Sequence, residues 1–247
     1  MCTLSFELTN DGYVVHFNRD ESVHRAIAKP PQQIGNTLMP IDAEKGGSWI
    51  SANAYGVCVS ILNNYQAQPP VSTVKKDARS RGELVKILST CRNKAEILQA
   101  SCQINCNDYP GFQLVIFGRD FSPFSLKPSE KNDGLLVESV VNTWPVSSSS
   151  YSEDVLSYRQ DYFQKHHKND HQGFHTSHHP EKGAYSVCVH REHIQTVSLT
   201  RVTVSSIFVA MDYAAGSPCC NELKSYQRIA TQELDDNYDQ GIHVALA

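Results

Sequence analysis

Residues 1–21 read MCTLSFELTNDGYVVHFNRDE, and their pattern decides the fold that we expect. Apolar side chains at positions 2, 4, 6 and 8 alternate with polar ones, which is typical of a half-buried strand. A second alternating run covers residues 13–18. Between the runs lies Asn10-Asp11-Gly12, whose residue types tolerate the positive φ of a tight turn. The stretch therefore predicts a β-hairpin.

The apolar pattern also predicts the register of this hairpin. If facing residue numbers sum to 21, both apolar sets share one face, and the pairs are Leu8–Tyr13, Phe6–Val15 and Leu4–Phe17. A slip of one residue would set Phe6 against His16. The favoured register places Cys2 opposite Arg19, with Asp20 one residue further along.

Cys2 in this position is a candidate nucleophile. Aminopeptidases remove an initiator Met that precedes a small residue, so we expect the mature chain to start at Cys2. The reference pKa of an α-amine is about 7.7–8.0 and that of a thiol about 8.5, so the amine can accept the thiol proton. Arg19 would favour the thiolate, and Asp20 would orient the ammonium or the arginine. The alternative is that Cys2 is only a small apolar residue of an edge strand.

Asn18-Arg19-Asp20-Glu21 resembles the signature of the NRDE family, which includes the Transport and Golgi organisation proteins and shares the Met-Cys-Thr start. Further matching blocks lie at residues 46–50, 53–56, 148–150, 178–181 and 186–191. Because these blocks are spread over about residues 1–220, the resemblance covers most of the chain.

The resemblance implies an α+β fold of the N-terminal-nucleophile (Ntn) hydrolase type, similar to the bile-salt and penicillin V amidases. That fold is a four-layer αββα sandwich of two antiparallel sheets. We expect a single domain over residues 1–247, with a loose tail from about residue 231. The implied activity is cleavage of a linear amide C–N bond, or acyl transfer, on a small-molecule amide or acyl substrate. The alternative is a non-catalytic carrier of haem or lipid on the same fold.

Composition excludes several other classes. The 22 Lys and Arg residues against 26 Asp and Glu give a net charge of −4 with no basic block, so we expect no nucleic-acid partner. No apolar run approaches the roughly 18 residues of a membrane span, and no secretory signal is visible, so we expect a cytoplasmic protein. The 8 cysteines are scattered without a CxxC pair, which favours free thiols. A homo-oligomer is compatible with this composition.

Periodicity predicts the remaining elements. We expect strands at residues 48–52, 57–63, 112–117, 134–141, 185–191, 195–204 and 206–213, with a weak strand candidate between the third and fourth. Helices are expected within residues 79–105, at 152–167 and at 221–230. Residues 22–45 are polar and interrupted by prolines, so we expect a surface connection that either walls the substrate pocket or crosses over passively.

Further candidate site residues follow from the resemblance. Asn63 ends an expected strand, as does the asparagine whose side-chain amide helps to hold the oxyanion in bile-salt hydrolases; Asn64 is the competing choice. A second donor is expected from the Ser-rich segment, either Asn142 or Ser149. Arg191 matches by strand and offset a late arginine of these amidases, and the alternative is a surface arginine.

Histidines crowd residues 166–193, at positions 166, 167, 171, 175, 178, 179, 190 and 193. Such density suggests a metal site, but no familiar ligand spacing such as HExxH appears. We therefore assign no metal ligand and no cofactor from the sequence, and whether this segment binds metal stays open. Cys219-Cys220 likewise lacks partner spacing for a metal or redox role.

Overall fold

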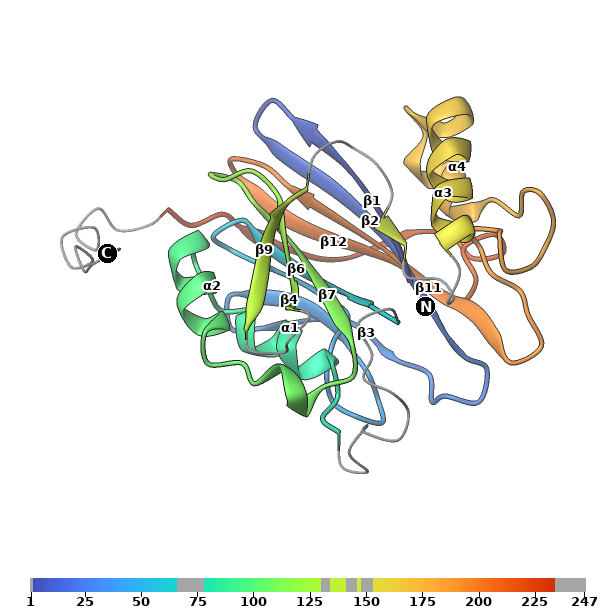
Figure 1. Cartoon of the computed structure of the whole chain (residues 1–247). Coiled ribbons are helices and arrows are strands. Elements are labelled where there is room, and N and C mark those ends of the chain that lie inside the picture. The colour runs from blue at the N-terminus through green and yellow to red at the C-terminus, as the bar shows by residue number, and fades with distance from the viewer. Residues whose placement is uncertain (1, 66–77, 130–133, 141–145, 148–152, 234–247) are drawn as a thin grey trace.

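In the computed structural model, two antiparallel sheets are stacked on each other (Figure 1). The structure describes residues 2–65, 78–129, 134–140, 146–147 and 153–233. The six-stranded sheet has the order β10-β1-β2-β11-β12-β13, with β1 Cys2–Thr9, β2 Gly12–Ser22, β10 Val146–Ser147, β11 Ile194–Val204, β12 Phe208–Ala215 and β13 Lys224–Ala230. The seven-stranded sheet runs from β3 to β9 in chain order, with β3 Lys29–Ile34, β4 Thr37–Ile41, β5 Ile50–Asn53, β6 Val57–Asn63, β7 Phe112–Gly118, β8 Phe124–Pro128 and β9 Leu135–Ser139.

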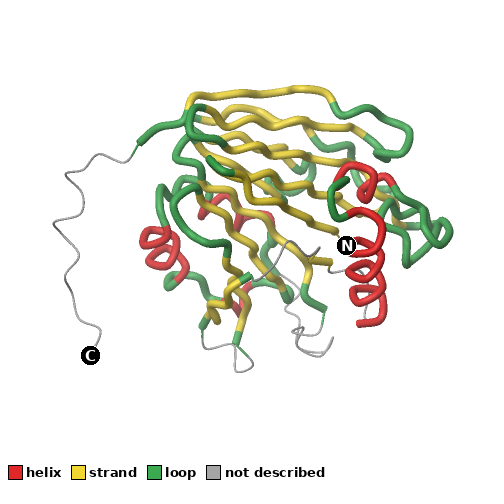
Figure 2. The backbone as a smooth tube through the Cα atoms, turned by 90° about the horizontal axis from the view of Figure 1, so that it is seen from above, coloured by secondary structure: helices red, strands yellow, loops and turns green. Residues whose placement is uncertain are grey.

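Helices cover the outer face of each sheet. The first pair, α1 (Gly82–Leu88) and α2 (Lys94–Ser101), lies on the seven-stranded sheet, where α1 packs on β5 and β6. The second pair, α3 (Glu153–Tyr162) and α4 (His171–Thr176), covers β10, β1 and β2, and a π-helical turn at Phe163–His167 continues α3. The two pairs lie on opposite sides of the molecule in Figures 1 and 2. The predicted αββα sandwich is thus confirmed.

The β1–β2 hairpin has the predicted register. Cys2 pairs with Arg19, and Leu4, Phe6 and Leu8 pair with the expected partners on β2. Most of its inner face is buried against the other sheet, although Leu8 near the turn is 59% exposed. The ring centroids of Phe6 and Phe117 are 5.0 Å apart, and the Tyr13 hydroxyl donates to the Gly56 carbonyl at 2.9 Å. These contacts hold the two sheets together, and β1 begins at Cys2.

Near Cys2 the polar face of this hairpin is buried as well, beneath α3 and α4, whereas Glu7 and Thr9 are exposed. Thr3, Ser5 and Asn18 are fully buried. Asn18 donates from its amide to the carbonyls of His175 and Val187, at 2.8 and 3.2 Å. Because buried polar groups need partners, this face is built to accept specific donors and acceptors from the helical layer.

Residues 22–45, expected to be a surface connection, contain a hairpin of β3 and β4, and Ser22, Arg25, Asp42 and Lys45 at the two ends of the segment line a cavity. A turn at Gly35, whose φ is +59°, joins the strands. Pro30 and Pro31 are tolerated because β3 is an edge strand, and the pairing with β4 is irregular between Lys29 and Gln32. The weak strand candidate after residue 117 is β8.

The other two differences lie late in the chain. No regular strand covers residues 185–191, where the only pairing among the described residues is a single bridge between His190 and Gln195. Side chains, chiefly those of Arg159 and Asn18, bind the carbonyls of this segment in place of a neighbouring strand. The predicted helix at 221–230 is wrong: β13 lies there and pairs with β12. Among the described residues, no helix has the length and apolar character needed to cross a bilayer.

Three histidines are buried between the six-stranded sheet and α4. Ser5 Oγ lies 2.8 Å from His171 Nδ1 and 2.9 Å from His175 Nε2, and the His16 ring stacks on both imidazoles. Burial lowers the pKa of His16 to about 3, and it lowers the pKa of His171 and that of His175, the latter strongly. All three are therefore neutral in the folded protein at pH 7.

This cluster predicts acid sensitivity. Between about pH 6.5 and pH 3, the unfolded chain binds protons that the folded chain does not, so the free energy of unfolding should fall as pH decreases. From about pH 7 to pH 5.5, His16 and His175 together should cost roughly 2–3 kcal/mol. Urea unfolding at both pH values measures this loss. His16→Phe should reduce the pH dependence, whereas His193→Phe, at a side chain that is 74% exposed, should not. A pH dependence unchanged by His16→Phe would contradict this account.

Candidate active site

Cys2 lies in the wall of a cavity of about 420 Å³. The cavity opens between the end of the β1–β2 hairpin, the loop after β4 and the start of α1. The charged, aromatic and amide-bearing residues of its wall are Arg19, Asp20, Glu21, Arg25, Asp42, Lys45, Trp49, Asn63, Tyr65, Arg79 and Arg81. Of the predicted site residues, Cys2, Arg19, Asp20 and Asn63 meet here.

The Cys2 thiol is buried at the end of the apolar core, and its exposed fraction is 8%. Burial raises the pKa of this thiol, and the nearby Asp20 carboxyl raises it further, whereas Arg19 lowers it. Arg19 lowers the pKa of the thiol, as expected, but burial raises it by more. A thiol in this environment stays protonated until a base accepts its proton.

Arg19 is fixed from three sides. Its guanidinium donates to Asp42 Oδ2 at 2.5 Å, lies 3.4 Å from Glu21 Oε2 and stacks over the Trp49 ring at 4.2 Å. Asp42 also accepts from Arg25 at 2.7 Å, and these two arginines lower the pKa of Asp42 against the effect of burial. The network holds the Arg19 guanidinium in one orientation beside the cavity.

Asp20 follows Arg19 on β2, so its side chain starts from the opposite face of the strand. It nevertheless forms part of the cavity wall. Its Oδ1 accepts from Thr196 Oγ1 at 2.6 Å. Burial raises the pKa of Asp20, while the positive charge of Arg159 and the Thr196 hydrogen bond act against this. The carboxyl is thus held rigidly by β11 close to the start of the chain.

Asn63 ends β6, as predicted, and contributes to the cavity wall. Its amide donates to the Tyr65 hydroxyl at 2.8 Å. An amide carries two N–H donors, and among the described residues only one of them is engaged, so the other is available for a bound group. Asn64, the competing choice, is not among the described residues of the cavity wall, and its backbone N–H bonds to the Gly111 carbonyl at 3.0 Å.

Two arginines that the sequence did not single out are part of this region. Arg81, just before α1, lines the cavity and donates to the Gly111 carbonyl at 3.1 Å; burial lowers its pKa. Arg159 on α3 has an exposed fraction of 0%, and its positive charge acts to lower the pKa of Asp20. Each of these arginines acts on residues that are far away in the chain, so no local sequence motif points to them.

Of the other predicted residues, only Arg191 lies in the part of the chain that the structure describes, and it does not reach the cavity. Arg191 is exposed and is not among the described residues that line it. Asn142 and Ser149 lie outside the described residues, so the second oxyanion donor stays a prediction.

A second cavity of about 350 Å³ adjoins the first and shares Arg19, Glu21, Ser22 and Arg25 with it. The loop after β2 and the strands β11 and β12 form its walls. Much of its lining is apolar, from Val23, Ala26, Ile27, Ala28, Val197, Tyr213 and Ala215. Together the two cavities offer a polar, cationic space next to an apolar one.

Solved structures define the class of this fold. The C2A mutant of conjugated bile acid hydrolase from Clostridium perfringens matches with a TM-score of 0.53 at 10% identity, over 95% of this chain and 99% of that one. The Caenorhabditis elegans ortholog of N-acylethanolamine-hydrolyzing acid amidase matches with a TM-score of 0.51 at 10% identity, over 81% of this chain and 92% of that one. The fold is therefore that of the Ntn hydrolases.

The family model described as Transport and Golgi organisation 2 matches residues 1–217. The chain belongs to this family, which is the NRDE family expected from the sequence. A comparison with curated protein sequences gives no match.

Proposed function

We propose that the protein is an N-terminal cysteine hydrolase or acyltransferase that acts on a linear amide. The observation that carries this proposal is the meeting of Cys2, Arg19, Asp20 and Asn63 at one cavity. A simple binding pocket has no need for a thiol at the second residue of the chain beside a fixed guanidinium and a strand-end amide. The proposal requires removal of Met1, so that Cys2 carries the free α-amine.

The first half of the reaction forms a thioester. The α-amine of Cys2 accepts the thiol proton, which compensates for the raised pKa of the buried thiol, and the sulfur attacks the amide carbonyl. The carbonyl oxygen becomes an oxyanion, to which Asn63 donates from its amide. The Cys2 ammonium then returns its proton to the leaving amine, and the C–N bond breaks.

The second half releases the acyl group. Water, deprotonated by the same amine, attacks the thioester and restores the Cys2 thiol with release of a carboxylic acid. If a second amine attacks in place of water, the product is a new amide, which is acyl transfer. Asp20, held by Thr196, orients the ammonium in both halves, and Arg19 balances the negative charge that develops at the sulfur and the oxyanion.

The neighbouring enzymes support an amide substrate with an apolar part. One acts on conjugated bile acids and the other hydrolyses N-acylethanolamines, and the mutation in the first changes a cysteine at the same position in its chain as Cys2. In this chain the apolar cavity would take the hydrocarbon part and the cationic cavity the polar part, with Arg19 at their shared wall. A screen of N-acyl amines with varied acyl length tests this assignment.

Asn63→Ala should lower kcat on an amide found in that screen by roughly a hundredfold or more, because one oxyanion donor is lost. KM should change much less, since the donor acts mainly on the charge of the intermediate. Asn64→Ala is the matched control and should retain near-normal kcat. Steady-state kinetics of both variants, with circular dichroism to show an intact fold, measures the effect. Equal losses in the two variants would remove the oxyanion role from Asn63.

A further inference from the structure

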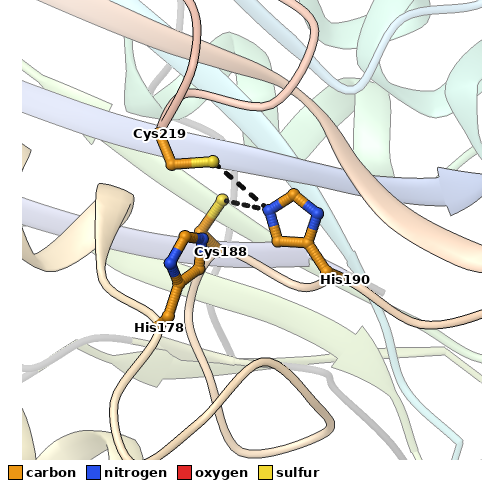
Figure 3. A group of neighbouring side chains, drawn as sticks. All are labelled: His178, Cys188, His190 and Cys219. Carbon is orange, nitrogen blue, oxygen red and sulfur yellow. Dashed lines mark hydrogen bonds between the residues drawn. The ribbon is translucent and has the colours of Figure 1, made fainter.

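A second cluster of reactive side chains lies outside the proposed active site. It consists of His178, Cys188, His190 and Cys219, whose potential ligand atoms all lie within 4.8 Å of one another (Figure 3). His190 Nε2 is 3.5 Å from Cys188 Sγ and 3.3 Å from Cys219 Sγ. The first three residues come from the segment between α4 and β11, and Cys219 comes from the connection between β12 and β13.

These separations fit one tetrahedral metal ion. With Zn–S bonds of about 2.3 Å and Zn–N bonds of about 2.0–2.1 Å, tetrahedral angles place neighbouring N and S ligand atoms roughly 3.6 Å apart and two sulfurs roughly 3.8 Å apart. Both N–S separations at His190 are within a few tenths of an ångström of this value. The cluster is therefore already close to the arrangement that a zinc ion requires.

The surroundings of the cluster also point to a ligand. Cys188 is buried, and the other three residues are half-buried. His178 Nε2 is buried without a hydrogen-bond partner among the described residues, although buried imidazole nitrogens normally have one. The rings of His178 and His190 meet edge to face with centroids 4.9 Å apart. A bound cation would supply the partner that this nitrogen lacks.

We propose that His178, Cys188, His190 and Cys219 form a structural zinc site. Two thiolates and two imidazoles favour Zn²⁺ over Mg²⁺ or Ca²⁺, which prefer oxygen ligands. Four protein ligands leave no open position for substrate or water, which is the pattern of a structural site. The ion joins the segment before β11 to the connection after β12.

The same two segments also support Asp20 of the proposed active site through Thr196. Val189 N, next to Cys188, donates to Thr196 Oγ1 at 2.8 Å, and Ser217 Oγ, two residues before Cys219, donates to the Thr196 carbonyl at 2.8 Å. Thr196 in turn donates to Asp20 at 2.6 Å. Zinc therefore fixes Val189 and Ser217, the two residues that donate to Thr196. Through Thr196 it also fixes the Asp20 carboxyl. The zinc site itself does not depend on the hydrolase proposal.

Metal analysis of the full-length protein tests this site. The protein is stripped with a chelator under reducing conditions and titrated with Zn²⁺, and separately with Co²⁺ as a spectroscopic probe. We expect one zinc per chain, and a Co²⁺ spectrum with the intense visible bands of tetrahedral coordination together with thiolate charge-transfer bands. Zinc should also raise Tm, because the ion binds the folded state.

Ligand variants separate this site from adventitious binding. Cys219→Ser and His178→Ala should each weaken zinc binding by more than about a hundredfold, because losing even an outer partner of a ligand costs about 10–100-fold. The controls are Cys102→Ser, at an exposed thiol, and His193→Ala, and both should bind as the wild type does. An octahedral Co²⁺ spectrum without sulfur bands, or equal affinity in the ligand variants and the controls, would overturn the proposal. The wild-type spectrum decides the question even if a ligand variant fails to fold.

Discussion

Cys2→Ala should lower kcat/KM for any amide substrate by at least about 10⁴-fold, because it removes the group that attacks the carbonyl. The fold should remain intact, since the thiol is small and lies at the end of the core. Cys2→Ser should keep at most weak activity, because a hydroxyl is a poorer nucleophile near neutral pH. Steady-state kinetics with the best substrate of the N-acyl amine screen measures both losses.

The control for this experiment is Cys102→Ala, which removes an exposed thiol and should leave kcat/KM unchanged. Full activity of Cys2→Ala would remove Cys2 from the mechanism. If that variant also still bound ligands, and substitutions in the apolar cavity abolished binding, the protein would be a carrier of a small hydrophobic ligand on a hydrolase fold.

Arg159→Met should reduce the free energy of unfolding by about 3–5 kcal/mol, the usual cost of removing one member of a buried charged network. The guanidinium donates to the Thr3 and Ser147 hydroxyls at 2.8 and 2.7 Å and to three consecutive carbonyls at residues 184–186. Methionine fills a similar volume but cannot donate to the three carbonyls that Arg159 binds. It also removes a positive charge that stabilises the ionised form of the buried Asp20. Urea unfolding at neutral pH measures the loss.

Arg191→Met is the matched control, because Arg191 is exposed and should change stability by no more than about 0.5 kcal/mol. A loss of similar size in both variants would indicate a general effect of charge removal. An Arg159→Met protein as stable as the wild type would show that water satisfies these carbonyls, contrary to the burial of the guanidinium.

Local patterns predicted those parts of the fold that depend on neighbouring residues in the sequence. The alternation in residues 2–8 and 13–18 is a property of each strand, and matching the two apolar faces fixed the register and placed Cys2 opposite Arg19. Asn63 was found for the same reason, because the apolar run of β6 ends there. The sequence misled where a strand lies at a sheet edge: β3 contains two prolines and β13 is largely polar, and both are stabilised by pairing with a neighbour.

The parts of the site that sequence reasoning missed depend on contacts between distant segments. Arg159 is an ordinary helical residue until α3 lies over Thr3 and the segment at 184–186. The strand pair β11–β12 lies between His178 and Cys219 in the sequence, so no ligand spacing in the His-rich segment could reveal the cluster. The choice of Arg191 relied on an expected strand at 185–191, and the structure has no such strand.

The most direct test of the central claim is the mass of the protein before and after reaction with a limiting amount of a 4-nitrophenyl acyl ester. An activated ester is preferable to a simple alkylating agent, because the exposed thiols of Cys102 and Cys220 would react with the latter without any active site. The account predicts a chain that begins at Cys2, followed by gain of one acyl group with release of 4-nitrophenolate. Peptide mapping should place the acyl group on Cys2. A chain that retains Met1, or acylation elsewhere with Cys2 unmodified, would contradict the account.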